Sequence, residues 1–232
     1  MKKLGLVGGT GPESTIFYYR TLTQGVQDVL GVGALPPLVI ESLSVFEVLD
    51  LCAGNDMDAL TAYLGDAVEW LAAAGAQVAT LTALTPHIVF DRLRDASPIP
   101  LISAVEAARS EALSRNVTTV ALLGTEPTMT GDFVAQPFRD AGIDVAVPSD
   151  DEIAFIHGRI VNELEHGIVT GPTRQGLVTV IERLRTECGV EQVVLGCTEL
   201  PLILDDASSP VPCLDPVEVH SRALIAAIVD QT

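Results

Sequence analysis

The chain has 232 residues, 48% of them hydrophobic and 4% aromatic, which is enough apolar material for one large domain or two small ones. Its formal net charge of −18 argues against nucleic acid or an anionic membrane as a partner. The only lysines are Lys2 and Lys3, so pyridoxal phosphate, whose Schiff base needs an internal lysine, is excluded as a cofactor.

The cysteines and histidines show no metal-binding pattern. The four cysteines have no CxxC spacing, and the histidines form no set with neighbouring carboxylates, so we expect no bound metal. We expect no signal peptide ahead of the first apolar strand, and no apolar run approaches the length of a membrane span. Dispersed cysteines without a signal peptide predict free thiols in a cytoplasmic protein.

Apolar runs alternate with helical patterns along the whole chain. We expect strands at residues 4–7, 38–40, 77–81, 99–102, 119–123, 144–147, 193–195 and 211–214. Helices are expected at residues 13–30, 56–74 and 104–114, in a stretch that runs to about 141, at 152–165 and 173–187, and from 217 onward. This alternation predicts an α/β protein with mainly parallel sheets flanked by helices.

Two stretches of the chain are similar to each other. Residues 75–85 and residues 189–199 both follow a long helix and contain a glycine, a β-branched strand and a small polar tip, so that Ala83 falls opposite Cys197. The similarity predicts two pseudo-symmetric lobes that face one cleft. We expect the first lobe at residues 1–102 and the second at 103–214, with a helix at 215–232 packing back on the first lobe.

The loop after the first strand, Gly8-Gly9-Thr10-Gly11-Pro12, precedes a helix. Glycines allow close backbone approach, and the N–H groups of a helix N-terminus can bind an anion. The loop is therefore a cradle for a carboxylate or phosphate, or an ordinary tight turn. A dinucleotide fingerprint would need glycine where Ser14 stands, so a nicotinamide-dependent function is the least favoured.

The stretch from Val193 to Pro201 carries the strongest chemical signal. A buried strand ends at Gly196 and is followed at once by the thiol of Cys197, the hydroxyl of Thr198 and the carboxylate of Glu199. Ligands bind at the carboxyl ends of strands in open α/β sheets. A cysteine there is a small core residue or a nucleophile or base, and its polar neighbours favour the functional interpretation.

Other polar residues also follow strands. His87, after Pro86, could hold substrate or cap a helix, and Thr125 and Thr128 could donate to a carboxylate or serve as turn and N-cap residues. An acidic substrate could pair with one of several arginines, among which the sequence does not choose: Arg20, Arg159 and Arg174.

Three motifs together resemble the aspartate/glutamate racemase family, the amino-acid racemases that work without pyridoxal phosphate. They are residues 8–15, Thr85-Pro86-His87 and residues 195–201, and the likeness runs from Leu4 to about His220. With glutamate at position 199, the motif is similar to that of the aspartate-racemase branch of the family, whereas glutamate racemases carry histidine there. The family implies a substrate between two α/β lobes, one thiol from each lobe on either side of the α-carbon, no cofactor, and often a homodimer.

The chain departs from the family pattern in the first lobe. Where the family typically has Cys-Asn-Thr, this sequence has Ala83-Leu84-Thr85, so the first thiol is missing. We expect Cys197 to be the catalytic acid/base, and the resemblance implies these substrate-binding residues: Gly9, Thr10, Thr85, His87, Thr125, Thr128, Thr198 and Glu199.

The leading hypothesis is a racemase-like enzyme acting at the α-carbon of a small amino acid. The alternatives are a one-thiol decarboxylase or lyase of the same superfamily, and a catalytically silent relative that binds a small carboxylate.

Overall fold

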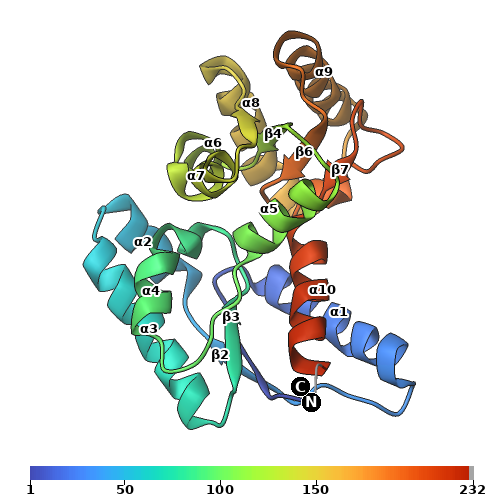
Figure 1. The fold of residues 1–232 in the computed structure, drawn as a ribbon. Coiled ribbons are helices and arrows are strands. Elements are labelled where there is room, and N and C mark those ends of the chain that lie inside the picture. The colour runs from blue at the N-terminus through green and yellow to red at the C-terminus, as the bar shows by residue number, and fades with distance from the viewer. Residues whose placement is uncertain (230–232) are drawn as a thin grey trace. The chain divides into compact units, whose positions relative to one another are not determined.

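The computed structural model describes residues 1–229, and its internal contacts divide the chain into two compact units. Unit 1 consists of Met1–Ala104 and the segment that begins at His220, and unit 2 consists of Val105–Val219. Figure 1 shows the elements of both units. The last three residues of the helix expected at 215–232 lie outside the described residues.

The sheet of unit 1 has three parallel strands in the order β2-β1-β3. They are β1 (Leu4–Gly8), β2 (Leu38–Ser42) and β3 (Val78–Leu81). Every residue of β1 is buried, as expected for the central strand of a sheet covered on both faces. The loops after β1 and β3 therefore leave the sheet side by side, because parallel neighbours end at the same edge.

Helices cover both faces of this sheet (Figure 1). On one side lie α2 (Val45–Ala53), α3 (Met57–Ala73) and α4 (Phe90–Ala96), with the short 3₁₀ helix η1 (Thr85–Val89) before α4. On the other side lie α1 (Pro12–Leu30) and α10 (Pro216–Val229). The C-terminal part of α10 is held to unit 1 by the Lys2 N–H, which donates to the Ile228 carbonyl at 2.8 Å.

The sheet of unit 2 has four parallel strands in the order β5-β4-β6-β7. They are β4 (Thr119–Leu123), β5 (Asp144–Ala146), β6 (Gln192–Leu195) and β7 (Cys213–Leu214). The accompanying helices are α5 (Ala104–Ser114), α6 (Glu126–Thr130), α7 (Asp132–Asp140), α8 (Asp150–Asn162) and α9 (Gly171–Cys188), with the 3₁₀ helices η2 (Leu164–His166) and η3 (Leu200–Leu202).

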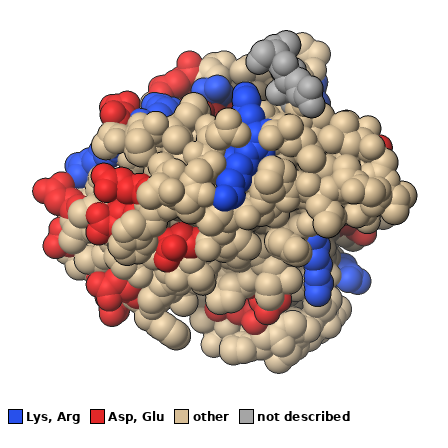
Figure 2. Space-filling view, turned by 90° about the horizontal axis from the view of Figure 1, so that it is seen from below, with Lys and Arg blue, Asp and Glu red and all other residues tan. Residues whose placement is uncertain are grey.

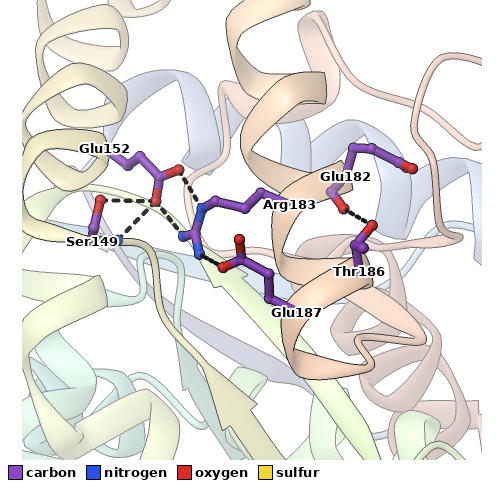
Figure 3. A network of polar contacts seen from close by, with 6 residues as sticks. All are labelled: Ser149, Glu152, Glu182, Arg183, Thr186 and Glu187. Atoms are coloured by element: carbon purple, nitrogen blue, oxygen red, sulfur yellow. Dashed lines mark hydrogen bonds and ion pairs between the residues drawn. The ribbon is translucent and has the colours of Figure 1, made fainter.

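Apolar side chains of α8 and α9 form the core of unit 2 against alternate residues of β4 and β6. The two helices are also joined at the surface by the network in Figure 3, in which Arg183 of α9 donates through Nε to Glu152 at 2.8 Å and through a second nitrogen to Glu187 at 2.7 Å. Glu152 also accepts from the Ser149 N–H at 2.8 Å, which fixes the N-terminus of α8.

The two sheets share one plan, and the predicted α/β fold with parallel sheets is confirmed. In each unit the first strand lies between the second and the third, and the third follows a glycine with positive φ, Gly75 in unit 1 and Gly189 in unit 2. The first and third strands of each unit are also paired in equivalent registers, since Val7 of β1 pairs with Leu81 of β3 and Leu123 of β4 pairs with Leu195 of β6. Ala83 and Cys197 are thus equivalent positions, two residues beyond these pairs.

Two expectations about individual elements were wrong, and one helix was not expected. The strand expected at 99–102 is only an isolated bridge between Ala79 and Leu101, because the flanking prolines lack the N–H groups that a ladder needs. The helix expected to run to about 141 is divided into α6 and α7 at Gly131, whose backbone is extended. The helix α2 was not predicted.

Among the described residues, no helix is long and apolar enough to cross a membrane. Acidic and basic side chains are interspersed on the face drawn in Figure 2, among larger areas of uncharged residues.

Candidate active site

Cys197 lies in the loop between β6 and η3, at the carboxyl end of the sheet of unit 2. Its side chain is half-buried and packs against the apolar core formed with α8 and α9. The loop is held close to the end of β4, because the Gly196 N–H donates to the carbonyl of Leu123, the last residue of that strand, at 2.6 Å. A Cβ on Gly196 would lie 2.8 Å from that carbonyl oxygen, so the approach requires glycine.

Glu199 is the immediate partner of the thiol. The Cys197 Sγ donates to Glu199 Oε2 at 2.8 Å, and the Thr198 hydroxyl donates to the same oxygen at 2.9 Å. Burial and the negative charge of Glu199 hold the pKa of Cys197 well above its usual value, although the Glu199 backbone N–H acts in the opposite direction. The thiol is therefore protonated at neutral pH, with a carboxylate placed to accept its proton.

Thr125 and Thr128 lie beside the Cys197 loop. Thr128 is buried, and its side chain lies where Cβ atoms on Gly124 and Gly196 would collide with it. The two threonine hydroxyls are 3.2 Å apart. The structure therefore brings together five of the residues that the sequence singled out, from the loops after β4 and β6: Thr125, Thr128, Cys197, Thr198 and Glu199.

Glu165, an exposed residue of η2, was not predicted to belong to the site. Its pKa is raised by partial burial and by the charge of Glu199, and its own charge contributes to the raised pKa of Cys197. Electrostatic interactions with His166 and His157 act in the opposite direction and lower the pKa of Glu165. Nothing local in the sequence marks this carboxylate, because Glu165 and Cys197 belong to different elements that are far apart in the chain.

In unit 1, the loop after β1 has a strictly constrained backbone. Gly9 has φ of +78°, and a Cβ there would lie 2.1 Å from the Leu43 carbonyl oxygen. Its N–H donates to Thr15 Oγ1 at 3.0 Å. The loop then enters α1 through Gly11, which offers no side-chain cap, so the first N–H groups of the helix are left to another acceptor.

Thr10 is buried in this loop, and its hydroxyl has no hydrogen-bond partner among the described residues. The neighbouring hydroxyls are already used: Ser14 donates to the Thr82 carbonyl, and Thr15 Oγ1 lies 3.1 Å from Thr82 Oγ1. A buried hydroxyl without a partner is uncommon, because its desolvation is not compensated. Together with the uncapped helix, it makes the loop suited to an anion.

Ala83 is half-buried and presents only a methyl group at the position equivalent to Cys197. His87, in contrast, is buried and uses both ring nitrogens. Its Nδ1 lies 3.0 Å from the Ala83 carbonyl, which can only accept, and its Nε2 accepts from the Ala104 N–H at 3.2 Å. The ring is thus the neutral Nδ1–H tautomer, and burial lowers its pKa to about 4. Thr85 is half-buried at the start of η1.

Two of the arginines considered from the sequence have partners within unit 2. Arg159 pairs with Glu163, and Arg174 Nε donates to the Ile203 carbonyl at 3.0 Å. Arg20 is exposed on α1. No group of His, Cys, Asp and Glu within residues 1–229 could hold a metal ion.

Comparison with known proteins identifies the family. Residues 7–224 match the sequence model of the family described as Asp/Glu/Hydantoin racemase. A crystal structure of an aspartate racemase homologue from Pyrococcus horikoshii superposes with a TM-score of 0.89, at 35% identity, over 99% of this chain and 100% of that one.

Two curated relatives extend this comparison. A broad specificity amino-acid racemase from Bacillus subtilis is 23% identical over 91% of this chain and 92% of its own length. A glutamate racemase from Corynebacterium kroppenstedtii is 30% identical over 136 residues, which is 57% of this chain but only 45% of that relative. The resemblance inferred from the three motifs is confirmed: the chain belongs to the Asp/Glu/Hydantoin racemase family.

Proposed function

We propose that this protein is a cofactor-independent, racemase-like enzyme that moves a proton at the α-carbon of a small amino acid, with Cys197 as the acid/base. The observation that carries the proposal is the hydrogen bond from the Cys197 thiol to Glu199 at a strand end. Family membership supports the class of reaction. The names of the relatives describe the activities of those proteins. For this chain, the substrate is itself part of the proposal.

The Cys197–Glu199 pair can shuttle a single proton. When Glu199 accepts the thiol proton, the thiolate is stabilised by the Glu199 backbone N–H and can remove the α-proton of the substrate. The reverse transfers return a proton to the carbanion and to the thiol. The hydroxyls of Thr125 and Thr128 are proposed to bind the substrate carboxylate, where negative charge increases as the α-proton leaves. Thr198 can join them only by releasing its hydrogen bond to Glu199, because a hydroxyl has a single proton to donate.

In unit 1, Gly9, Thr10 and Thr85 are proposed as further substrate-binding residues. The unpartnered Thr10 hydroxyl and the uncapped N-terminus of α1 support an anionic ligand at this loop. His87 is better suited to fixing the backbone around Ala83 than to touching substrate, since both its nitrogens are engaged.

A one-thiol decarboxylase or lyase is the second candidate. Two observations favour it: Ala83 supplies no group that can titrate, and the Cys197 thiol is protonated and so ready to protonate an enediolate. Inversion of an amino acid by Cys197 alone would also need a second proton donor. A silent, carboxylate-binding relative is the third candidate.

Exchange of the α-hydrogen in deuterium oxide tests the proposal. NMR on a panel of amino acids should show exchange that falls by about 100-fold or more in Cys197→Ser, the usual contribution of a general acid–base group. Cys188→Ser, at an exposed thiol, is the matched control and should keep the wild-type rate. Chiral chromatography of the same samples separates exchange with inversion from exchange with retention.

The remaining outcomes identify the alternatives. Release of carbon dioxide from a malonate-type acid, lost in Cys197→Ser, would favour the decarboxylase. Tight carboxylate binding that Cys197→Ala leaves unchanged, with no exchange or decarboxylation, would favour the silent relative and contradict the proposed enzyme.

A further inference from the structure

His157 joins α8 to the loop after β4. Its Nδ1 accepts from the backbone N–H of Glu126, the first residue of α6, at 3.3 Å. Because a backbone N–H can only donate, Nδ1 carries no proton, and the ring is the neutral tautomer with its proton on Nε2. Glu126 directly follows Thr125, so this hydrogen bond fixes the backbone next to one of the two threonines of the site.

The imidazole is carried by a well-packed part of unit 2. His157 is half-buried on α8, one turn away from Ile153 and Ile160, which are buried in the apolar core of the unit. The helix α6 lies beside α8 (Figure 1), and Met129 of α6 is buried in the same core. Apolar packing therefore keeps the two helices together, and the directional hydrogen bond from α6 to the imidazole fixes the first turn of α6.

The start of α6 is satisfied without any threonine hydroxyl. Thr125 is the N-cap residue, but its side chain makes no capping hydrogen bond. The N–H groups of Thr128 and Met129 donate to the Thr125 carbonyl at 2.9 Å and 3.1 Å, Pro127 has no N–H, and that of Glu126 is bonded to the imidazole. The Thr125 and Thr128 hydroxyls are 3.2 Å apart, so one donates to the other and the second keeps its proton for a ligand.

From these contacts we propose that His157 is a positioning residue, which acts through the Glu126 backbone to hold the Thr125 and Thr128 hydroxyls where a substrate carboxylate binds. The proposal rests on the proposed function for the role of the two threonines. Without the imidazole, the Glu126 N–H needs another acceptor, and the first turn of α6 is no longer held in one orientation. The proton shuttle of the proposed function does not include the imidazole, so the effect falls on carboxylate binding rather than on proton transfer.

The hydrogen bond is tested without turnover, by NMR of protein labelled with ¹⁵N. The ring of His157 should be the Nε2–H tautomer, and the Glu126 amide proton should exchange slowly with solvent. In His157→Leu this exchange should be faster by about tenfold or more, because the acceptor is gone. In His157→Asn, whose Oδ1 takes the place of Nδ1, it should remain slow. The Nδ1–H tautomer, or an amide rate that His157→Leu leaves unchanged, would overturn the proposal.

The positioning role is tested by the kinetics of α-hydrogen exchange. In His157→Leu, KM should rise on the order of fivefold while kcat stays within about twofold, as expected for the loss of one neutral hydrogen bond that supports binding. His157→Asn should restore the wild-type KM, and His166→Leu, at an exposed histidine of η2, is the matched control. If His157→Leu does not fold, His157→Gln, whose amide oxygen reaches the place of Nε2 instead of Nδ1, should show the same rise. An unchanged KM, or a loss confined to kcat, would contradict the positioning role.

Binding of malonate separates this proposal from the proposed function. If no amino acid undergoes exchange, the proposed function fails, and a malonate titration followed on the methyl signals of Thr125 and Thr128 decides the positioning role. A Kd on the order of fivefold higher in His157→Leu supports the proposal. An equal Kd, or no response of these signals in the wild-type protein, overturns it.

Discussion

Cys197 is kept protonated by burial and by Glu199, while the equivalent position in unit 1 holds the methyl group of Ala83. A thiol whose pKa is raised stays protonated at neutral pH, so it can act as a base only after a neighbour takes its proton. Glu199 is placed to be that neighbour, and in the proposed function it exchanges protons with the thiol as well as binding substrate.

Gly9 is the residue whose backbone is most tightly constrained in the loop after β1. Replacing it with alanine should lower the free energy of unfolding by at least about 2 kcal/mol, because φ of +78° is unfavourable for a side chain and the new Cβ would meet the Leu43 carbonyl. Urea denaturation measures the change. Gly33→Ala, where no atom lies within 4 Å of the added Cβ, should change stability by less than about 0.5 kcal/mol. Equal effects of the two substitutions would contradict this account.

At the scale of elements, a buried polar network joins α1, β3 and α10. The Tyr18 hydroxyl lies 2.7 Å from His220 Nδ1, and the Thr80 hydroxyl lies 3.0 Å from His220 Nε2. Because Thr80 donates its own proton to the Ile102 carbonyl, Nε2 is the protonated nitrogen and Nδ1 accepts from Tyr18. The ring is therefore neutral, and both of its nitrogens are hydrogen-bonded. It fixes α10 at His220, the first residue of that helix that belongs to unit 1.

This network predicts a loss of stability in mild acid. Burial lowers the pKa to about 3 for His220 and to about 4 for His87, against 6.5 in an unfolded chain. Below pH 6.5 the unfolded chain binds protons that the folded chain does not, so the free energy of unfolding falls by up to about 1.4 kcal/mol per pH unit for each ring. Above pH 6.5 neither ring contributes a pH dependence.

Urea denaturation between pH 7.5 and 5.5, where most carboxylates stay ionised, measures the slope. His220→Gln should flatten it, even if the substitution lowers stability overall. His166→Gln, at an exposed histidine of η2, should leave it unchanged. An unaltered slope in His220→Gln would show that this ring does not titrate on unfolding.

At the scale of the whole molecule, charge opposes compactness. A net charge of −18 on 232 residues gives mutual repulsion that is relieved when the chain expands. The ion pairs at the surface offset this little, because exposed pairs such as Arg92–Asp58 and Arg185–Glu182 contribute weakly in water. Long-range repulsion thus outweighs local attraction.

The melting temperature should therefore rise with ionic strength. Scanning calorimetry at about 0.01 M and about 0.5 M monovalent salt compares a Debye length near 30 Å with one of a few ångströms. Sodium and potassium chlorides should act alike if screening is the cause. A melting temperature that falls as salt is added would show that the ion pairs, such as the Arg183 network, outweigh the repulsion.

Much of the fold could be predicted from the sequence, because it follows from local patterns. Buried apolar runs between amphipathic helices gave the parallel strands β1 and β4 and the helices α1 and α5 close to their observed bounds. The same patterns failed at 99–102 and at Gly131, where proline and an extended glycine interrupt regular hydrogen bonding. The motif around Cys197 was visible because thiol, hydroxyl and carboxylate are adjacent in the chain.

Only the tertiary structure decided how those side chains are used. Both nitrogens of His87 are taken by backbone groups, one of them at Ala104, which is distant in sequence. The hydroxyl of Thr10 is buried without a partner, and Glu165 reaches the charge environment of Cys197 from another element. Burial, pairing and electrostatic proximity depend on residues far apart in the chain. They therefore cannot be predicted from periodicity and spacing, which determined the elements and the motif.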